Sequence, residues 1–124
     1  MQRLLDEIFL LKSMIKVRIM RILFAFDVDG TLDISNGPIS SKWLYKLKEK
    51  GAIVGFAGNH DKAKKEGLLG FDFYDTGDPE ALERIKKKFK ADLYIHIGDT
   101  EEDKESARKA GFTFIRAEDF RIEE

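Results

Sequence analysis

The feature that most constrains this chain is the run 22–31, which reads Ile-Leu-Phe-Ala-Phe-Asp-Val-Asp-Gly-Thr. Residues 19–26 are apolar with one exception and show no helical period, so they predict a strand covered on both faces in a parallel α/β sheet. Asp27 and Asp29 leave the carboxyl end of this strand, where open parallel sheets place their ligand crevice. We therefore expect the chemistry of the chain to be located at this strand end.

The two aspartates need a compensating charge if both are ionised. Carboxylates one residue apart repel each other and lose solvation, so the pair calls for a cation or a proton between them. Hard oxygen ligands at this density suit Mg²⁺ better than a soft transition metal. The alternative is an ordinary Asx turn without metal, because Asp and Gly are common turn residues.

The rest of the chain alternates between predicted strands and helices. The first half is expected to contain a loop at 33–38, a helix from Ser40 or Ser41 to Gly51, a strand at 52–57, a short helix at 62–69 and an edge strand at 71–74. The second half is expected to contain a helix capped by Asp78 with Pro79 in its first turn, a strand at 93–97, a helix ending at Gly111 and a strand at 112–115. Five strands separated by helices predict an α/β fold with a three-layer, doubly wound, Rossmann-like and mostly parallel sheet. One core domain, 19–124, accounts for this pattern and leaves no room for a large second domain.

Residues 1–18 precede the first predicted strand. Their apolar residues follow a helical stripe interrupted by charges, which is too short and too charged to span a membrane and lacks the pattern of a signal peptide. We expect an amphipathic helix that packs on the sheet or on a second copy of the chain, which would make a homo-oligomer. The alternative is a poorly ordered leader before a true start at Met14 or Met20.

Composition limits the cellular compartments and the classes of binding partner that we expect. The net charge of -1 argues against a broad surface for nucleic acid or membrane. The chain has no cysteine, so the cytoplasm is the default expectation. Charged residues make up 36% of the chain while side-chain amides are scarce, a balance that is also seen in heat-adapted proteins.

Two further strand ends carry polar residues. Gly58 and Asn59 follow the second predicted strand, and Asp99 follows the fourth, with Asp103 four residues later. Because the carboxyl ends of parallel strands share one sheet edge, these residues are expected to meet Asp27 and Asp29 around one cation-sized space.

At these positions the chain resembles a known family. The segments 27–31 (Asp-Val-Asp-Gly-Thr), 57–59 (Ala-Gly-Asn) and 98–103 (Gly-Asp-Thr-Glu-Glu-Asp) look like the first, second and fourth motifs of the haloacid dehalogenase-like superfamily of phosphotransferases. The resemblance covers residues 20 to about 116, and the order of the motifs on strand ends is quite specific.

The resemblance implies a role for each matching residue. Asp27 would be the nucleophile that forms an aspartyl-phosphate, and Asp29 would be the general acid and then the base that activates water. Mg²⁺ would be held by the carboxylates of Asp27 and Asp99 and by the backbone carbonyl of Asp29, with Asp103 assisting. The phosphorylated substrate would lie among turn N–H groups and beside a threonine, at Gly30, Thr31, Gly58 and Asn59.

Two positions depart from the family pattern. Ala57 stands where the second motif normally offers a Ser or Thr hydroxyl to the phosphate. The third-motif lysine would fall at residues 76–78, which hold no lysine. Surface lysines of the neighbouring helices are the remaining candidates, and the sequence does not choose among Lys62, Lys64, Lys65 and Lys86.

Both a structural and a functional interpretation exist for Asp103, His96 and His60. Thr100 and Asp103 resemble a helix capping box, which can coexist with metal binding. His96 lies inside the fourth predicted strand and is expected to be a satisfied core residue. His60 follows the second strand end, where a histidine could contact substrate.

The leading hypothesis is a Mg²⁺-dependent phosphomonoester hydrolase without a cap domain, whose open site suits a large substrate or a cap from a neighbouring subunit. The alternative is a metal- or phosphate-binding module that has lost turnover. A receiver domain phosphorylated on aspartate fits poorly, because its phosphorylated residue ends the third strand, whereas here the acidic pair ends the first long one.

Overall fold

The computed structural model describes residues 20–123. The segment 1–18, predicted to be a helix or leader, lies outside these residues. The strands are β1 (Ile22–Phe26), β2 (Ile53–Ala57), β3 (Phe73–Asp75), β4 (Leu93–Gly98) and β5 (Thr113–Arg116). The helices are α2 (Ser41–Glu49), α3 (His60–Lys65), α4 (Ala81–Lys88) and α5 (Glu101–Ala110), with short 3₁₀ turns η1 (Asp33–Ser35) and η2 (Ala117–Asp119).

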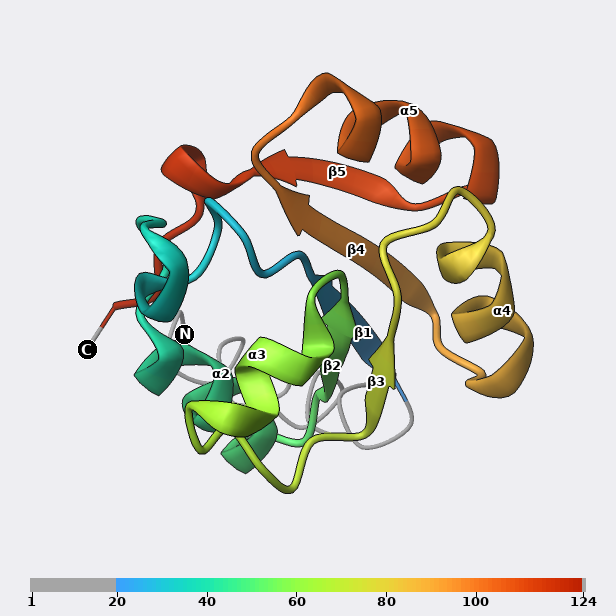
Figure 1. Cartoon of the computed structure of the whole chain (residues 1–124). Coiled ribbons are helices and arrows are strands. Elements are labelled where there is room, and N and C mark those ends of the chain that lie inside the picture. Colours follow the sequence, from blue (N-terminus) through green and yellow to red (C-terminus); the bar gives the residue numbers. More distant parts are fainter. Residues whose placement is uncertain (1–19, 124) are drawn as a thin grey trace, which may run out of the picture.

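The five strands form one sheet in the order β3-β2-β1-β4-β5 (Figure 1). All four neighbouring pairs are parallel, so the mostly parallel sheet that the sequence predicts is entirely parallel within the described residues. β1 lies at the centre, and the chain runs outward from it first to β2 and β3 and later to β4 and β5. The strand order reverses beside β1, which is where doubly wound sheets bind their ligands.

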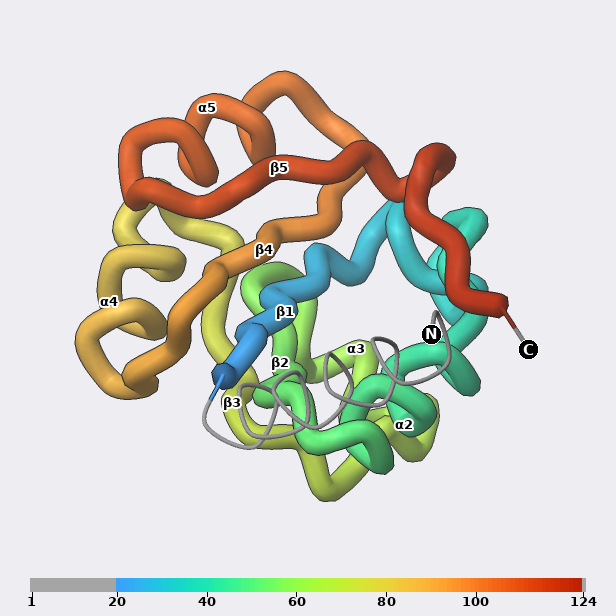
Figure 2. The backbone as a smooth tube through the Cα atoms, turned by 180° about the vertical axis from the view of Figure 1, so that it is seen from behind, coloured from blue at the N-terminus to red at the C-terminus, as the bar shows by residue number. Residues whose placement is uncertain are grey.

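Helices cover both faces of the sheet (Figures 1 and 2). Phe24 and Phe26 of β1 belong to the apolar cluster that includes residues of α2 and α3. Leu23 and Ala25 belong to the opposite cluster, which includes residues of α4 and α5. Successive residues of β1 therefore pack on opposite faces of the sheet, and both faces are apolar. This confirms the predicted arrangement of a sheet between two layers of helices.

Helix boundaries follow the expected caps in two cases. The hydroxyl of Ser40 accepts a hydrogen bond from the N–H of Lys42, at 3.3 Å, and begins α2. Gly111 ends α5 in a left-handed conformation, with φ of 79°, as the sequence predicts.

Other boundaries differ from the prediction. α3 begins at His60 rather than residue 62, because the side-chain oxygen of Asn59 caps it. The prediction of Asp78 as the cap of the fourth helix is wrong: the cap position is Glu80, and α4 begins at Ala81. The Asp78 carboxylate accepts the Glu80 N–H at 2.9 Å, so it stabilises the turn that precedes the helix.

Candidate functional site

Three carboxylates meet where β1 and β4 end. Asp27, Asp99 and Asp103 each offer one oxygen atom, and these three atoms lie within 4.8 Å of one another. Asp27 follows β1, Asp99 follows β4, and Asp103 lies in the first turn of α5. We call Asp27, Asp99 and Asp103 the acidic trio.

The turn after β1 brings the trio together. Thr31 is fully buried, and its hydroxyl oxygen lies 3.3 Å from Oδ2 of Asp27 and 3.4 Å from Oδ1 of Asp99. Gly30 has φ of 72°, and a Cβ atom at this residue would collide with the Asp99 carboxylate. The Gly-Thr turn therefore allows close approach of Asp99 and supplies a hydroxyl between two of the acids.

The Asp29 carboxylate points to different partners. Its Oδ1 accepts a hydrogen bond from the Ser35 hydroxyl at 2.8 Å, and its Oδ2 accepts one from the side-chain amide of Asn59 at 3.3 Å. Asp29 is exposed, whereas Asp27 is partly buried. The two aspartates of the first motif thus have separate environments, as two groups with different chemical roles require.

The backbone donors expected to hold a phosphate are partly in use. The N–H of Gly30 donates to the Ser35 carbonyl at 2.8 Å, and the N–H of Gly58 donates to the Asp75 carbonyl at 3.0 Å. Both N–H groups therefore have partners within the chain, and phosphate binding at Gly30 and Gly58 stays a prediction. What Gly58 provides is space, because a Cβ atom there would collide with the Asp27 carboxylate.

Asp103 is held from two sides. Its Oδ2 accepts hydrogen bonds from the N–H groups of Asp99 and Thr100, both at 3.1 Å, and the Thr100 hydroxyl accepts the Asp103 N–H. This confirms the capping box at the start of α5. On the other side, Nε2 of His96 lies 3.6 Å from Oδ1 of Asp103.

His96 is a core residue, as predicted. Its ring is 2% exposed, and its Nδ1 lies 2.8 Å from the Ala25 carbonyl of β1. Because a carbonyl can only accept, Nδ1 carries a proton, and the ring joins β1 to the start of α5.

The electrostatics of the trio favour a cation. Burial, followed by the negative charge of Asp103 and the nearby Asp99 carboxyl, raises the pKa of Asp27 from 3.8 to about 8. Burial also opposes ionisation of Asp103, but hydrogen bonds from His96 and Thr100 outweigh it and lower the pKa of that carboxyl. Without a metal, a proton on Asp27 relieves the repulsion.

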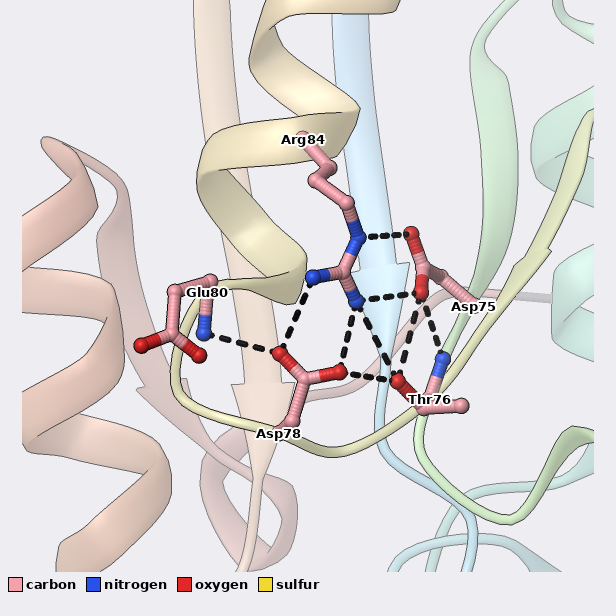
Figure 3. A network of polar contacts seen from close by, with 5 residues as sticks. All are labelled: Asp75, Thr76, Asp78, Glu80 and Arg84. Atoms are coloured by element: carbon pink, nitrogen blue, oxygen red, sulfur yellow. Dashed lines mark hydrogen bonds and ion pairs between the residues drawn. The ribbon is translucent and has the colours of Figure 1, made fainter.

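An arginine that the sequence analysis missed lies at the end of β3. Arg84 of α4 donates to both carboxylates that flank the β3–α4 connection (Figure 3). Its Nη2 lies 2.8 Å from Oδ1 of Asp75 and 2.6 Å from Oδ2 of Asp78, and Nη2 also donates to the Thr76 hydroxyl at 3.2 Å. An arginine does follow Asp78 by six residues in the sequence, but the third-motif pattern specifies a lysine.

The Arg84 network affects the acids on both sides. Partial burial of Asp75 raises the pKa of its carboxyl, but hydrogen bonds from Arg84 and the Thr76 N–H outweigh this and lower it. Hydrogen bonds from Arg84 and Thr76 hold the pKa of Asp78 well below its usual range. The Asp75 backbone carbonyl accepts from Gly58, so the network also connects to the turn beside Asp27.

The four lysines considered for the third motif have different surroundings. Lys86 donates to the Ala110 carbonyl at 3.2 Å, and Lys64 lies over the Tyr74 ring, 4.8 Å from its centroid. Lys62 and Lys65 lie on α3 and stay open as candidates. His60 begins α3, with 23% of its side chain exposed and its Nδ1 3.4 Å from Asp61, and contact with substrate stays a prediction.

A divalent cation fits the residues of the acidic trio. Their three hard carboxylate oxygens lie within 4.8 Å of one another, and because burial and acidic neighbours raise the pKa of Asp27, a nearby cation would favour its ionised form. Asp27, Asp99 and Asp103 are therefore the residues that would hold Mg²⁺. The carboxylate of Asp29 faces Ser35 and Asn59, and metal binding by the Asp29 backbone carbonyl stays a prediction.

Comparison with known proteins supports the fold. The chain matches no protein-family model and no curated protein. Among solved structures it is similar to the NMR structure of the core domain of a protein described as "a putative phosphoglycolate phosphatase" from Streptococcus pneumoniae TIGR4. The identity is 22% and the TM-score 0.59, over 78% of this chain and 80% of that chain.

At this identity the likeness shows the fold. It confirms the predicted α/β architecture, which is an entirely parallel sheet here, and no cap domain is present within residues 20–123. None of the helices in this part of the chain is long and apolar enough to cross a membrane. The cytoplasmic location, the homo-oligomer and the lack of nucleic-acid binding stay predictions.

Proposed function

We propose that this chain, which has the core fold of a haloacid dehalogenase-like phosphatase, is a Mg²⁺-dependent phosphomonoester hydrolase that works through an aspartyl-phosphate on Asp27. The observation that carries the proposal is the acidic trio at the point where the strand order reverses, with Asp29 beside it in a different environment. A bound Mg²⁺ would supply positive charge that offsets the repulsion between an anionic nucleophile and an anionic phosphoryl group.

The residues of the chain can be assigned to two steps. In the first, a carboxylate oxygen of Asp27 attacks phosphorus, the ester P–O bond breaks, and Asp29 gives its proton to the leaving oxygen. In the second, Asp29 takes a proton from water as the water oxygen attacks phosphorus, and the bond to Asp27 breaks to release phosphate. Asp29 is suited to both tasks because its carboxylate is exposed and its side chain is held by Ser35 and Asn59.

Arg84 is the candidate for the cation that the third motif lacks. Its network includes Thr76 and Asp78, and these two residues line a small space of about 10 Å³ together with Ala57 and Asp103. The guanidinium therefore contacts two of the residues that line the same small space as Asp103 of the trio. An arginine suits this position because it stays charged and presents several donors in one plane.

A binding module without turnover is the second candidate function. Ala57 offers no hydroxyl, and the N–H groups of Gly30 and Gly58 are used within the chain. The loss of a donor in such sites lowers turnover by about a hundredfold or more. This candidate predicts Mg²⁺ binding without hydrolysis.

An activity assay distinguishes the hydrolase from the binding module. It measures hydrolysis of p-nitrophenyl phosphate and a panel of phosphomonoesters, with and without Mg²⁺. Phosphoglycolate belongs on the panel because the description of the similar structure names it. We expect Mg²⁺-dependent turnover that Asp27→Asn abolishes, while Asp119→Asn, an exposed change of equal charge in η2, retains it. Mg²⁺ binding with no turnover of any ester would overturn the hydrolase and favour the binding module.

A further inference from the structure

A second cavity lies directly against the acidic trio. It has a volume of about 300 Å³ and is lined by Gly30, Pro38, Asp99, Arg116, Ala117 and Glu118. Gly30 and Asp99 belong to the site described above, whereas Arg116 and the residues after it belong to β5 and η2. The size is at the lower end of pockets that hold small molecules. A group attached to a phosphoryl at the trio could therefore extend into this space.

Arg116 gives this cavity a positive charge at a defined place. It ends β5 and lies in register with Gly98, the residue before Asp99. Its Nη1 donates to the Asp99 backbone carbonyl at 3.4 Å, and its Nη2 is paired with the Glu101 carboxylate. The guanidinium is thus held beside Asp99, which lines the cavity and also belongs to the acidic trio.

The partner of Arg116 can be exchanged. The Glu101 side chain is 75% exposed and the Arg116 side chain 35% exposed, so their ion pair is a surface interaction. Such pairs contribute little stability, which means that Glu101 can turn to water at small cost. An arginine freed in this way offers donors that match a carboxylate or a phosphate. The pair with the Glu101 carboxylate shows that the Arg116 guanidinium can bind an anion.

Two acidic residues compete with this preference. Glu118 lines the cavity and is exposed, and Asp99 carries a negative charge that a metal on the trio would offset. If these acids dominated, the cavity would favour a cationic group over an anionic one. The test must therefore compare leaving groups of all three charge types.

We propose that this cavity receives the leaving group of the phosphomonoester and that Arg116 selects leaving groups that carry an anionic substituent. The inference rests on the proposed hydrolase function and specifies its substrate class: a small phosphomonoester with a carboxylate or second phosphate close to the ester. Arg116 is a specificity-determining residue, since it contacts the leaving group and not the transferred phosphoryl group.

The test uses three esters of similar size. They are 3-phosphoglycerate with a carboxylate, glycerol 3-phosphate with a hydroxymethyl group in its place, and phosphoethanolamine with an ammonium group. We expect wild-type kcat/KM to be highest for 3-phosphoglycerate, and Arg116→Met to reduce its advantage over glycerol 3-phosphate by about tenfold to a hundredfold. Glu101→Gln should increase that advantage by removing the competing carboxylate.

The matched control is Arg108→Met, which removes the same charge from an exposed pair with Glu105 on α5. It should leave the ratio between the esters unchanged. A preference for phosphoethanolamine, or an equal loss toward all three esters in Arg116→Met, would overturn the proposal, the second because it would show that Arg116 acts through the Asp99 backbone.

Failure of the proposed function gives a different result. A wild-type chain that hydrolyses none of the three esters, and does not hydrolyse p-nitrophenyl phosphate, is not the proposed hydrolase. Because the esters then survive, calorimetry on the wild type measures their dissociation constants in Mg²⁺ directly. A tighter constant for 3-phosphoglycerate that weakens about tenfold in Arg116→Met would keep the anion-selective cavity, and equal constants would remove it as well.

Discussion

Asp27 shows how the surroundings of a single residue decide its chemistry. In the folded, metal-free chain its pKa is raised from 3.8 to about 8 by burial and by the charges of its acidic neighbours. The folded chain therefore holds a proton that the unfolded chain has released, across the range between these two values. Through this group the free energy of unfolding falls as pH rises from about 4 to about 8.

Asp27→Asn should remove this dependence. Asn keeps the shape of Asp without the charge, so we expect the variant to be more stable than the wild type at pH 7 in EDTA, by roughly 1–4 kcal/mol. Urea unfolding between pH 5 and pH 9 measures the difference, which should grow with pH. Parallel stability curves for the two proteins would contradict a raised pKa at this residue.

Ala57 is the residue at which the family pattern is missing a hydroxyl. It is almost fully buried at the end of β2, next to the Gly58 turn. We compare Ala57→Thr with Ala57→Val, because the two side chains have nearly the same shape and any overpacking affects both. On the proposed function, kcat/KM for p-nitrophenyl phosphate should be about tenfold higher in the Thr variant than in the Val variant. Equal values would show that no phosphate oxygen approaches this position.

The connection from β3 to α4 depends on one arginine. Arg84 joins Asp75 at the end of the strand to Asp78 before the helix, and the Asp75 side chain is only 18% exposed. Removing the guanidinium leaves a largely buried carboxylate without its ionic partner, which is costly. The same change loosens the backbone to which Gly58 is hydrogen-bonded.

Arg84→Met should therefore lower the free energy of unfolding at pH 7. Because the pKa of Asp75 is lowered in the fold, this contribution is present at neutral pH and is lost as pH falls into the acidic range. Arg84→Lys should restore part of it. The control Arg108→Met breaks an exposed pair one helical turn apart and should lower the free energy of unfolding less than Arg84→Met does, as measured by urea unfolding.

For the whole molecule, sheet topology determines whether the acids meet. The trio comes from segments that are far apart in the sequence, and the pairing of β1 with β4 brings their ends to one place. A cation that binds here binds the folded chain and not the unfolded one. It must therefore stabilise the entire fold by mass action.

Mg²⁺ should raise the melting temperature in proportion to the logarithm of its concentration, with a stabilisation of about 2.7 kcal/mol at one hundred times the dissociation constant. Asp99→Asn should abolish the increase, whereas Asp119→Asn should retain it. Thermal unfolding at pH 7.5 with Mg²⁺ or EDTA measures the effect. A melting temperature that does not respond to Mg²⁺ in the wild type would count against a metal at the trio.

Much of the fold could be predicted from local patterns. Apolar runs identified the strands, and Ser40, Thr100 and Gly111 marked helix ends because capping depends on nearby backbone groups. The error at Asp78 arises because its side chain also has a partner outside the local backbone. Asp78 is a residue type that commonly caps helices, but its carboxylate accepts hydrogen bonds from Arg84 and from the Glu80 N–H in the turn before α4.

The sequence by itself determined which chemical groups are present and on which strand ends they lie, because strand period and turn composition are local properties. Only the tertiary structure decided which groups meet. It placed Asp103 with Asp27 and Asp99, turned the Asp29 carboxylate toward Ser35 and Asn59, and held Arg84 between two acids. These contacts depend on strand order and on the direction of each side chain across the sheet edge, and neither is contained in local spacing.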